Sequence, residues 1–185
     1  KLPKMPPLVF LFTVCVHRFM GVDLDYIYQE LRSRFPDVIF VESYMEPISQ
    51  KDGLTPEQRL RDGMFSVLNK KEDVPVQVSI LGSDMKIEES SEMKEIFREA
   101  GMTVLESSAC QTMDQYLSMG NSSLFVTCYP TALHGVKKLA ARLQVPYLYL
   151  PASFSYQEIN HQMLALRDQL LAMKVQFPAQ KDRHA

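Results

Sequence analysis

The sequence predicts an α/β fold of the Rossmann-like kind, with doubly wound parallel sheet or sheets and helices on both faces. Short apolar runs typical of buried strands recur along the chain and alternate with segments of helical period. Residues 123–151 contain a complete strand–helix–strand unit. Capping residues mark the start of several helical segments. Together these patterns indicate a succession of parallel strands joined by crossover helices.

The unit in residues 123–151 is the clearest of these. One apolar run ends at Cys128, a helical segment follows, and a second apolar run ends at Pro151. The helical segment has apolar side chains on one face and basic side chains mostly on the other. In parallel sheets, ligands bind beyond the carboxyl ends of the strands. Cys128 and the segment after Leu150 lie at such ends.

The rest of the chain repeats this plan. Residues 8–14 form a continuous apolar run, typical of a strand buried on both faces. Further strands are predicted at residues 38–41, 76–81, 102–105, 124–126 and 147–150. Besides the crossover helix of the 123–151 unit, helices are predicted at residues 23–34, from residue 55 onward, and at 88–100, 112–119 and 155–173. Six strands therefore alternate with helices.

Local signals define several element boundaries. Thr55 and Gln58 form a capping box around a proline at the first helical position. Asp23 is the expected N-cap of the first helix, and residues 16–21 before it are predicted to be a loop. Gly101 is the expected glycine after a helix end, where the chain turns with positive φ.

A polar stretch at residues 70–73 predicts a division of the chain. Residues 1–72 are then the end of a first α/β unit that carries Cys15, and residues 73–185 form a second Rossmann-like unit. Packing as one continuous domain is the alternative, because a solvated surface turn explains the polar stretch equally well. The chain begins at Lys1 without an initiator methionine, and we expect it to be a fragment of a longer polypeptide.

Composition excludes several classes of function. The net charge of −2 gives no electrostatic support for binding nucleic acid or a membrane surface. No apolar run approaches the roughly 18 residues that span a bilayer. Three cysteines are an odd number, which argues against a disulfide framework and predicts reduced thiols in the cytoplasm.

Motifs for nucleotide and zinc chemistry are absent from the sequence. Gly82 stands alone after a predicted strand, so it is expected to be a turn glycine, and no nucleotide cofactor is predicted. Cys15 and Cys128 each end a predicted strand, where a thiolate can bind metal or act as a nucleophile. The alternative is that both are small buried apolar residues. Cys110 has less support, and His17 is notable only for its position two residues after Cys15.

Four segments carry a family resemblance. Residues 14–24 read Val-Cys-Val-His-Arg-Phe-Met-Gly-Val-Asp-Leu. They resemble a segment of nitrogenase component 1 subunits that reads Cys, a few apolar residues, then Ile-Gly-Asp-Asp-Ile/Leu. Residues 109–116 are similar to the family's Gly-Asp-Gly-Thr-x-x-Glu stretch, residues 124–129 to a strand ending in His-Cys-Tyr, and residues 145–147 to Gly-Ile-Pro-Trp/Tyr. The resemblance spans about residues 9–171, in matching order and spacing.

The resemblance implies roles for individual residues. Cys15 matches an iron–sulfur ligand of the family, shared at a subunit interface. Cys128 matches the cysteine that binds iron of the active-site cofactor in the molybdenum–iron protein, so Cys128 and Tyr129 are expected to contact a cofactor or substrate cavity, and His17 is a pocket neighbour. A cluster needs about four thiolate-type ligands. The cluster is therefore expected in the full-length parent and not in this fragment alone.

The resemblance also implies an activity and partners. The parent is expected to be an oxidoreductase that passes electrons from an iron–sulfur cluster to a bound substrate, and the isolated fragment to be inactive. Its partners would be a second nitrogenase-like subunit or a homodimer, and an ATP-dependent iron–sulfur reductase. The family's Arg-Ser pair beside the cofactor is replaced by Pro130-Thr131, which argues against dinitrogen reduction.

Two alternatives stay open. One is a non-catalytic α/β module that binds a tetrapyrrole, a metal chelate or another small ligand. The other is a purely structural Rossmann-like domain, which two inert, buried cysteines would suit best.

Overall fold

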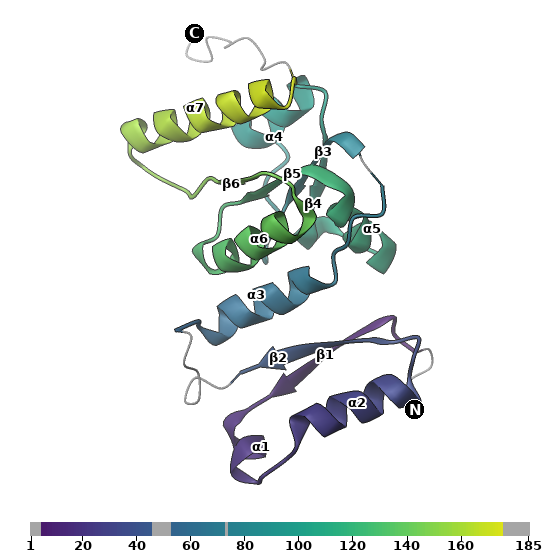
Figure 1. The fold of residues 1–185 in the computed structure, drawn as a ribbon. Helices are drawn as coiled ribbons and strands as arrows, with labels where there is room; N and C mark the ends of the chain where they lie inside the picture. The colour runs from purple at the N-terminus through teal and green to yellow at the C-terminus, as the bar shows by residue number, and fades with distance from the viewer. Residues whose placement is uncertain (1–4, 46–52, 73, 176–185) are drawn as a thin grey trace. The chain divides into compact units, whose positions relative to one another are not determined.

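A computed structural model describes residues 5–45, 53–72 and 74–175 (Figure 1). Within these ranges, strands and helices alternate along the chain as the sequence predicts. The chain separates into two compact units, Lys1–Val67 and Leu68–Ala185. In the described part of the chain, no helix is both long enough and apolar enough to cross a membrane.

The unit Lys1–Val67 is built on one pair of parallel strands. Strand β1 (Leu8–Thr13) pairs along its length with β2 (Ile39–Tyr44). A short helix, α1 (Cys15–Phe19), follows β1, and α2 (Leu24–Arg34) and α3 (Pro56–Ser66) lie on opposite sides of the strand pair (Figure 1). Helices lie on both faces of the pair, but the full burial that the apolar run of β1 predicts is not reached. The apolar residues 8–11 are half-buried and Phe12 is 50% exposed.

Specific contacts fasten these two helices to the strands. Tyr28 of α2 is a buried residue, and its hydroxyl donates to the Leu11 carbonyl oxygen at 3.3 Å. In α3, Gly63 lies so near β2 that an added β-carbon would be 3.0 Å from Cγ1 of Val41. The glycine lets the α3 backbone approach the strand closely.

The unit Leu68–Ala185 contains a four-stranded parallel sheet in the order β4–β3–β5–β6. Its strands are β3 (Val74–Ile80), β4 (Thr103–Glu106), β5 (Ser122–Thr127) and β6 (Tyr147–Tyr149). The chain runs from β3 outward to β4 on one side, and from β5 outward to β6 on the other. The direction of progression therefore reverses between β3 and β5, which makes their carboxyl ends the topological switch point of the sheet.

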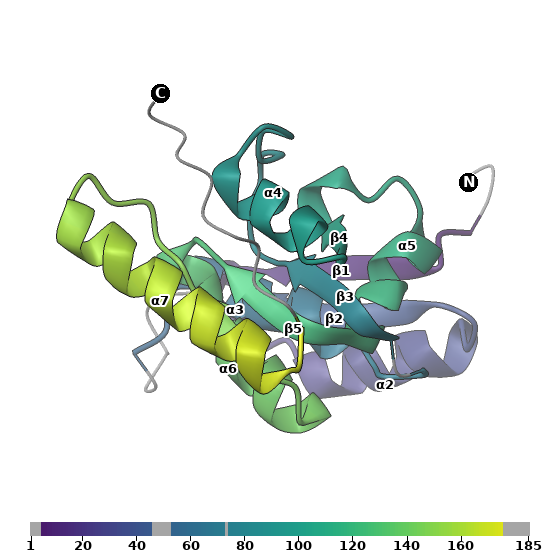
Figure 2. The ribbon, with the colours of Figure 1, turned by 90° about the horizontal axis from the view of Figure 1, so that it is seen from above.

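Helices cover both faces of this sheet, which confirms the doubly wound arrangement (Figures 1 and 2). Helices α4 (Glu92–Glu99) and α7 (Tyr156–Ala172) lie on one face, and α6 (Pro130–Leu143) lies on the other. The short helix α5 (Met113–Ser118) and the 3₁₀ turns η1 (Ser107–Ala109) and η2 (Met119–Asn121) complete the unit. The main core joins the first face to α4 and α7, with these fully buried members: Val78, Ile80, Phe97, Leu124, Val126, Leu166 and Leu170.

Capping signals in the sequence are confirmed. Thr55 accepts from the Gln58 backbone N–H at 3.2 Å, and the Gln58 side chain accepts from the Thr55 N–H at 2.8 Å. Asp23 accepts from the Tyr26 N–H at 3.0 Å. Gly101 has φ +73°. Each is a local interaction, so the sequence alone carries the information needed to predict it.

Two sequence predictions are wrong. Residues 16–21 were expected to form a loop, but α1 begins at Cys15, and Nδ1 of His17 accepts from the Val14 N–H at 3.2 Å. Histidine makes the hydrogen bond that Glu or Gln makes in a capping box, but the N-cap Val14 has no side-chain acceptor to complete the box. One helical turn is also too short to show a period. Helix α4 begins at Glu92 and not at residue 88, because Ser91 is the N-cap and accepts from the Lys94 N–H.

Candidate functional site

The switch point of the sheet is closely packed around Gly82. This residue follows β3 with φ +92°, and a β-carbon added to it would lie only 2.1 Å from Cβ of Ala132 in α6. The adjacent Leu81 N–H donates to the Val126 carbonyl at 2.8 Å. Gly82 thus allows the start of α6 to approach the strand ends, and the structure gives it the turn and packing role expected from the sequence.

Cys128 directly follows β5 and lines a pocket of about 240 Å³. Three other segments complete the pocket: the loop and first turn of α4, the residues after β6, and one face of α7. Most of its lining is apolar, as at Ile87, Leu150 and Leu166. The carboxyl end of β5 therefore opens into a small cavity with a thiol on its wall.

Burial and charge both act on the Cys128 thiol. Burial raises the pKa of Cys128, and the negative charge of Glu106 raises it further. Both effects disfavour the thiolate. The thiol is consequently neutral at physiological pH until a ligand displaces its proton.

We therefore expect Cys128 to react slowly with iodoacetamide near neutral pH. In a chain carrying Cys15→Ser and Cys110→Ser, the pH midpoint of its alkylation rate lies above the ordinary cysteine pKa of 9.0, because only the thiolate is nucleophilic. Adding Glu106→Gln lowers the midpoint, because the negative charge is removed, but the midpoint stays raised by the burial of the thiol. A midpoint at or below 9.0 in the chain that keeps Glu106 would contradict this environment of the Cys128 thiol.

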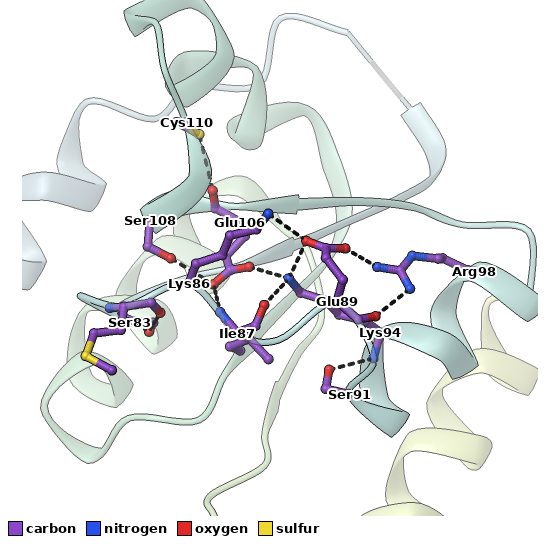
Figure 3. Close-up of polar contacts among 11 residues, drawn as sticks. Ser83, Lys86, Ile87, Glu89, Ser91, Lys94, Arg98, Glu106, Ser108 and Cys110 are labelled. Carbon is purple, nitrogen blue, oxygen red and sulfur yellow. Dashed lines mark hydrogen bonds and ion pairs between the residues drawn. The ribbon is translucent and has the colours of Figure 1, made fainter.

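A buried ion pair lies next to the pocket (Figure 3). Nζ of Lys94 in α4 is 2.7 Å from Oε2 of Glu106 at the end of β4, and both side chains are 3% exposed. The Lys94 ammonium also donates to the Ile87 carbonyl at 2.7 Å and lies 3.2 Å from Oε1 of Glu89. The ammonium thus donates two hydrogen bonds, to Ile87 and Glu89, and neutralises Glu106 through the ion pair.

Glu106 completes this network from the sheet. Its Oε1 accepts from the Ile87 N–H at 2.7 Å and from the Ser108 hydroxyl at 2.8 Å. The loop between β3 and α4 is thus held at Ile87 by both members of the ion pair. Since Ile87 also lines the pocket, the ion pair fixes one wall of the cavity at Cys128.

Glu89 forms the exposed edge of the same network. Hydrogen bonds from Lys86 and Lys94 lower the pKa of Glu89 to about 2 from 4.5, and Arg98 also contacts its carboxylate (Figure 3). A depressed pKa in the folded state stabilises the fold above the unfolded pKa, and this contribution is lost as pH falls through the folded one.

We accordingly expect the stability difference between the wild type and Glu89→Gln to depend on pH. The pH-dependent part of the difference is fully present well above pH 4.5, declines between pH 4.5 and 2, and is lost as the pH falls through about 2. Urea unfolding at a series of pH values measures it, with Glu88→Gln as the neighbouring control. A difference that persists unchanged at pH 2 would refute the assigned pKa.

The sequence interpretation overlooked Lys94 and Glu106. Lys94 lies between the apolar positions Met93 and Ile96, so a helical projection already places it at the edge of the buried face. Glu106 ends a strand and is followed by two serines. These were available signals, but pairing across twelve residues of chain needs the tertiary structure.

Tyr129 and Cys128 are adjacent in the chain but differ in environment. Tyr129 is the N-cap of α6, with its backbone N–H donating to Oγ1 of Thr127 at 3.2 Å. Its side chain is 37% exposed, and the residues described as lining the pocket do not include it. The cofactor contact predicted for Cys128 and Tyr129 stays a prediction.

Cys15 lies in the other unit, at the first position of α1, where β1 ends. The thiol is half-buried, and large apolar side chains close to it in the chain are exposed: Phe12 50%, Val14 41%, Val16 52%, Phe19 79% and Met20 74%. Such a concentration of exposed apolar side chains is typical of a surface that contacts another polypeptide.

Comparisons with known proteins identify the family. A sequence profile described as "Nitrogenase component 1 type Oxidoreductase" matches residues 3–183. This match covers nearly the whole chain. The chain belongs to the nitrogenase component 1 family. No curated protein sequence gives a significant match.

Solved nitrogenase structures have the same fold as this family member. The structure titled "Nitrogenase Cp1 at pH 5" matches with TM-score 0.60 and 9% sequence identity, over 91% of this chain and 38% of that one. A second, at pH 6.5, matches with TM-score 0.57 and 11% identity, over 91% of this chain and 37% of that one. This chain therefore spans well under half the length of the nitrogenase chains it resembles.

An iron–sulfur cluster does not fit the donor set of this chain alone. The chain has three cysteines, whereas a cluster needs about four thiolate-type ligands. Among residues 5–45, 53–72 and 74–175, no group of three or more His, Cys, Asp or Glu side chains is arranged to hold a metal ion. Ligands from other polypeptide segments would have to complete a cluster site.

Proposed function

We propose that this chain forms part of a longer nitrogenase component 1-type oxidoreductase that passes electrons from an iron–sulfur cluster to a bound substrate. The observation that carries the proposal is the family match over residues 3–183, which contains both Cys15 and Cys128. Each cysteine follows the last residues of a parallel strand, where ligands of α/β folds bind.

In this proposal, Cys15 contributes one thiolate to the cluster. Its half-buried position after β1 suits a ligand, since a thiol there is accessible from outside the unit. The exposed Val16, Phe19 and Met20 give a partner an apolar surface beside it. A second nitrogenase-like subunit, or a second copy of the parent, would cover this surface and exclude water. An ATP-dependent iron–sulfur reductase would supply the electrons.

Cys128 would contact the substrate or cofactor in this proposal. Its position at the switch point, in a cavity of about 240 Å³, supports this role. The chain's own contribution is to hold the cavity open, through the ion pair that fixes Ile87, and to keep the thiol protonated until a ligand binds.

Iron content of the full-length parent tests this proposal. Iron and acid-labile sulfide are measured on anaerobically purified protein, for the wild type, Cys15→Ala and Cys110→Ala. We expect the wild type and Cys110→Ala to contain both elements and Cys15→Ala to lose them. A parent without iron under strict anaerobiosis, or a Cys15→Ala protein with unchanged iron, would overturn the cluster role.

The alternative function is a non-catalytic module that binds a small ligand at Cys128. The apolar pocket favours it, but the volume of about 240 Å³ lies below the roughly 300–1,000 Å³ usual for drug-sized ligands. A ligand smaller than a tetrapyrrole therefore suits the cavity better. An iron-free parent would leave this alternative as the better interpretation.

A further inference from the structure

The pocket at Cys128 is lined by three sulfur-containing side chains. They are Cys128 after β5, Met93 in the first turn of α4 and Met163 in α7. All three are partly buried and pack against the core of the unit. Three separate elements thus bring a thiol and two thioethers to one cavity of about 240 Å³.

We propose that this pocket binds one copper(I) ion through the Cys128 thiolate and the Met93 and Met163 thioethers. Soft sulfur ligands select soft, monovalent copper over the harder divalent ions. Methionine has three rotatable bonds, so each thioether can adjust its direction within the pocket.

Charge balance favours a monovalent ion in this pocket. One thiolate neutralises one copper(I) ion, and the two thioethers are uncharged, so the bound complex has no net charge. Burying a neutral complex among Ile87, Leu150 and Leu166 avoids the large cost of burying a net charge. Glu92 also lines the pocket, but this residue is exposed, so its carboxylate is solvated at the rim and the ion among the apolar side chains has only the thiolate as a charged ligand.

Divalent ions also lack suitable ligands here. Zinc requires about four N, S or O ligands from His, Cys, Asp or Glu. No group of three such side chains is arranged to hold a metal in the described part of the chain. The mostly apolar walls also offer few oxygen ligands to an ion, which suits the low coordination numbers of copper(I).

The binding step is a ligand exchange without electron transfer. The S–H bond of Cys128 breaks, its proton goes to solvent, and a sulfur–copper bond forms with the ion still in the monovalent state. The inference concerns the same Cys128 pocket to which the proposed function assigns a substrate or cofactor, but it does not depend on the cluster at Cys15 and can be tested without it.

Copper(I) titration of the full 185-residue chain tests the inference. The chain carries Cys15→Ser and Cys110→Ser, so that Cys128 is the only thiol, and competes anaerobically for copper(I) with a colorimetric chelator. We expect one ion per chain. Met93→Leu and Met163→Leu, which conserve side-chain volume, each weaken binding roughly tenfold or more, and Cys128→Ser abolishes it.

A matched control uses the other thiol of the same unit. Sγ of Cys110 lies 3.8 Å from Sδ of Met119, so a Cys15→Ser, Cys128→Ser chain retains one thiol beside one thioether. We expect it to bind copper(I) much more weakly. Equal binding by this control, or full affinity in both Met→Leu variants, would overturn the inference.

X-ray absorption spectroscopy gives a readout that does not depend on variants. Three sulfur neighbours around copper are expected, and fewer sulfurs, or nitrogen or oxygen neighbours, would also overturn it. Far-UV circular dichroism of each variant establishes that the fold is retained. A chain that fails to bind copper(I) would overturn the inference alone. The proposed function would still be decided by the iron content of the parent.

Discussion

Lys94→Met is expected to lower the free energy of unfolding of the unit Leu68–Ala185 by about 3–5 kcal/mol. The substitution leaves the Glu106 carboxylate buried without its ion-pair partner, and it removes the hydrogen bond to the Ile87 carbonyl. Removing one partner of a buried ion pair strongly lowers the free energy of unfolding, because the other charge stays buried without compensation. Urea unfolding followed by far-UV circular dichroism measures the change.

Two controls separate the buried charge from lost packing. Lys94→Met combined with Glu106→Gln removes both charges, and we expect it to recover part of the lost stability. The exposed pair of Arg34 and Glu30 has side chains 72% and 39% exposed, so Arg34→Ala should cost less than about 1 kcal/mol. A Lys94→Met protein no less stable than Arg34→Ala would show that the buried pair has no special role.

Gly82→Ala is expected to be the second most damaging change, with a loss of roughly 3 kcal/mol or more in unfolding free energy. Two costs combine at this position. The backbone has φ +92°, which strains any side chain, and the new β-carbon would lie 2.1 Å from Cβ of Ala132. Helix α6 must therefore move away from the strand ends. Thermal and urea unfolding both report the loss.

Gly101→Ala is the matched control. Gly101 has φ +73°, but no atom lies within 4 Å of the position of an added β-carbon. This variant has the backbone strain alone, about 1 kcal/mol. If the two alanine variants are equally stable, then the close approach of Ala132 is not what requires glycine at position 82.

Elements with local signals are the part of the fold that sequence reasoning predicted well. The Thr55 capping box, the Asp23 N-cap and Gly101 all depend on residues within a few positions of one another. The apolar runs are local signals too. A strand with helices on both faces does not alternate apolar and polar residues, so an uninterrupted apolar run predicts a strand of a parallel sheet. Helix α1 was missed because a single turn has no measurable period.

The candidate site was predicted only in part. Strand ends were foreseeable, and they placed Cys15 and Cys128 where ligands of α/β folds bind. The pocket itself joins Met93, Cys128 and Met163 from three elements, and no local pattern links residues so far apart. Whether Cys15 and Cys128 bind a cofactor stays a prediction for the full-length parent.

Short-range order in this protein therefore follows from its sequence: which segments become strands or helices, where the caps lie, and which family the motifs resemble. The pairing of Lys94 with Glu106, the contact of Gly82 with Ala132 and the cavity beside Cys128 arise only when the elements pack. The physical reason is distance along the chain. Propensity and capping act over a few residues, whereas burial, ion pairing and cavity shape depend on side chains that only the folded sheet brings together.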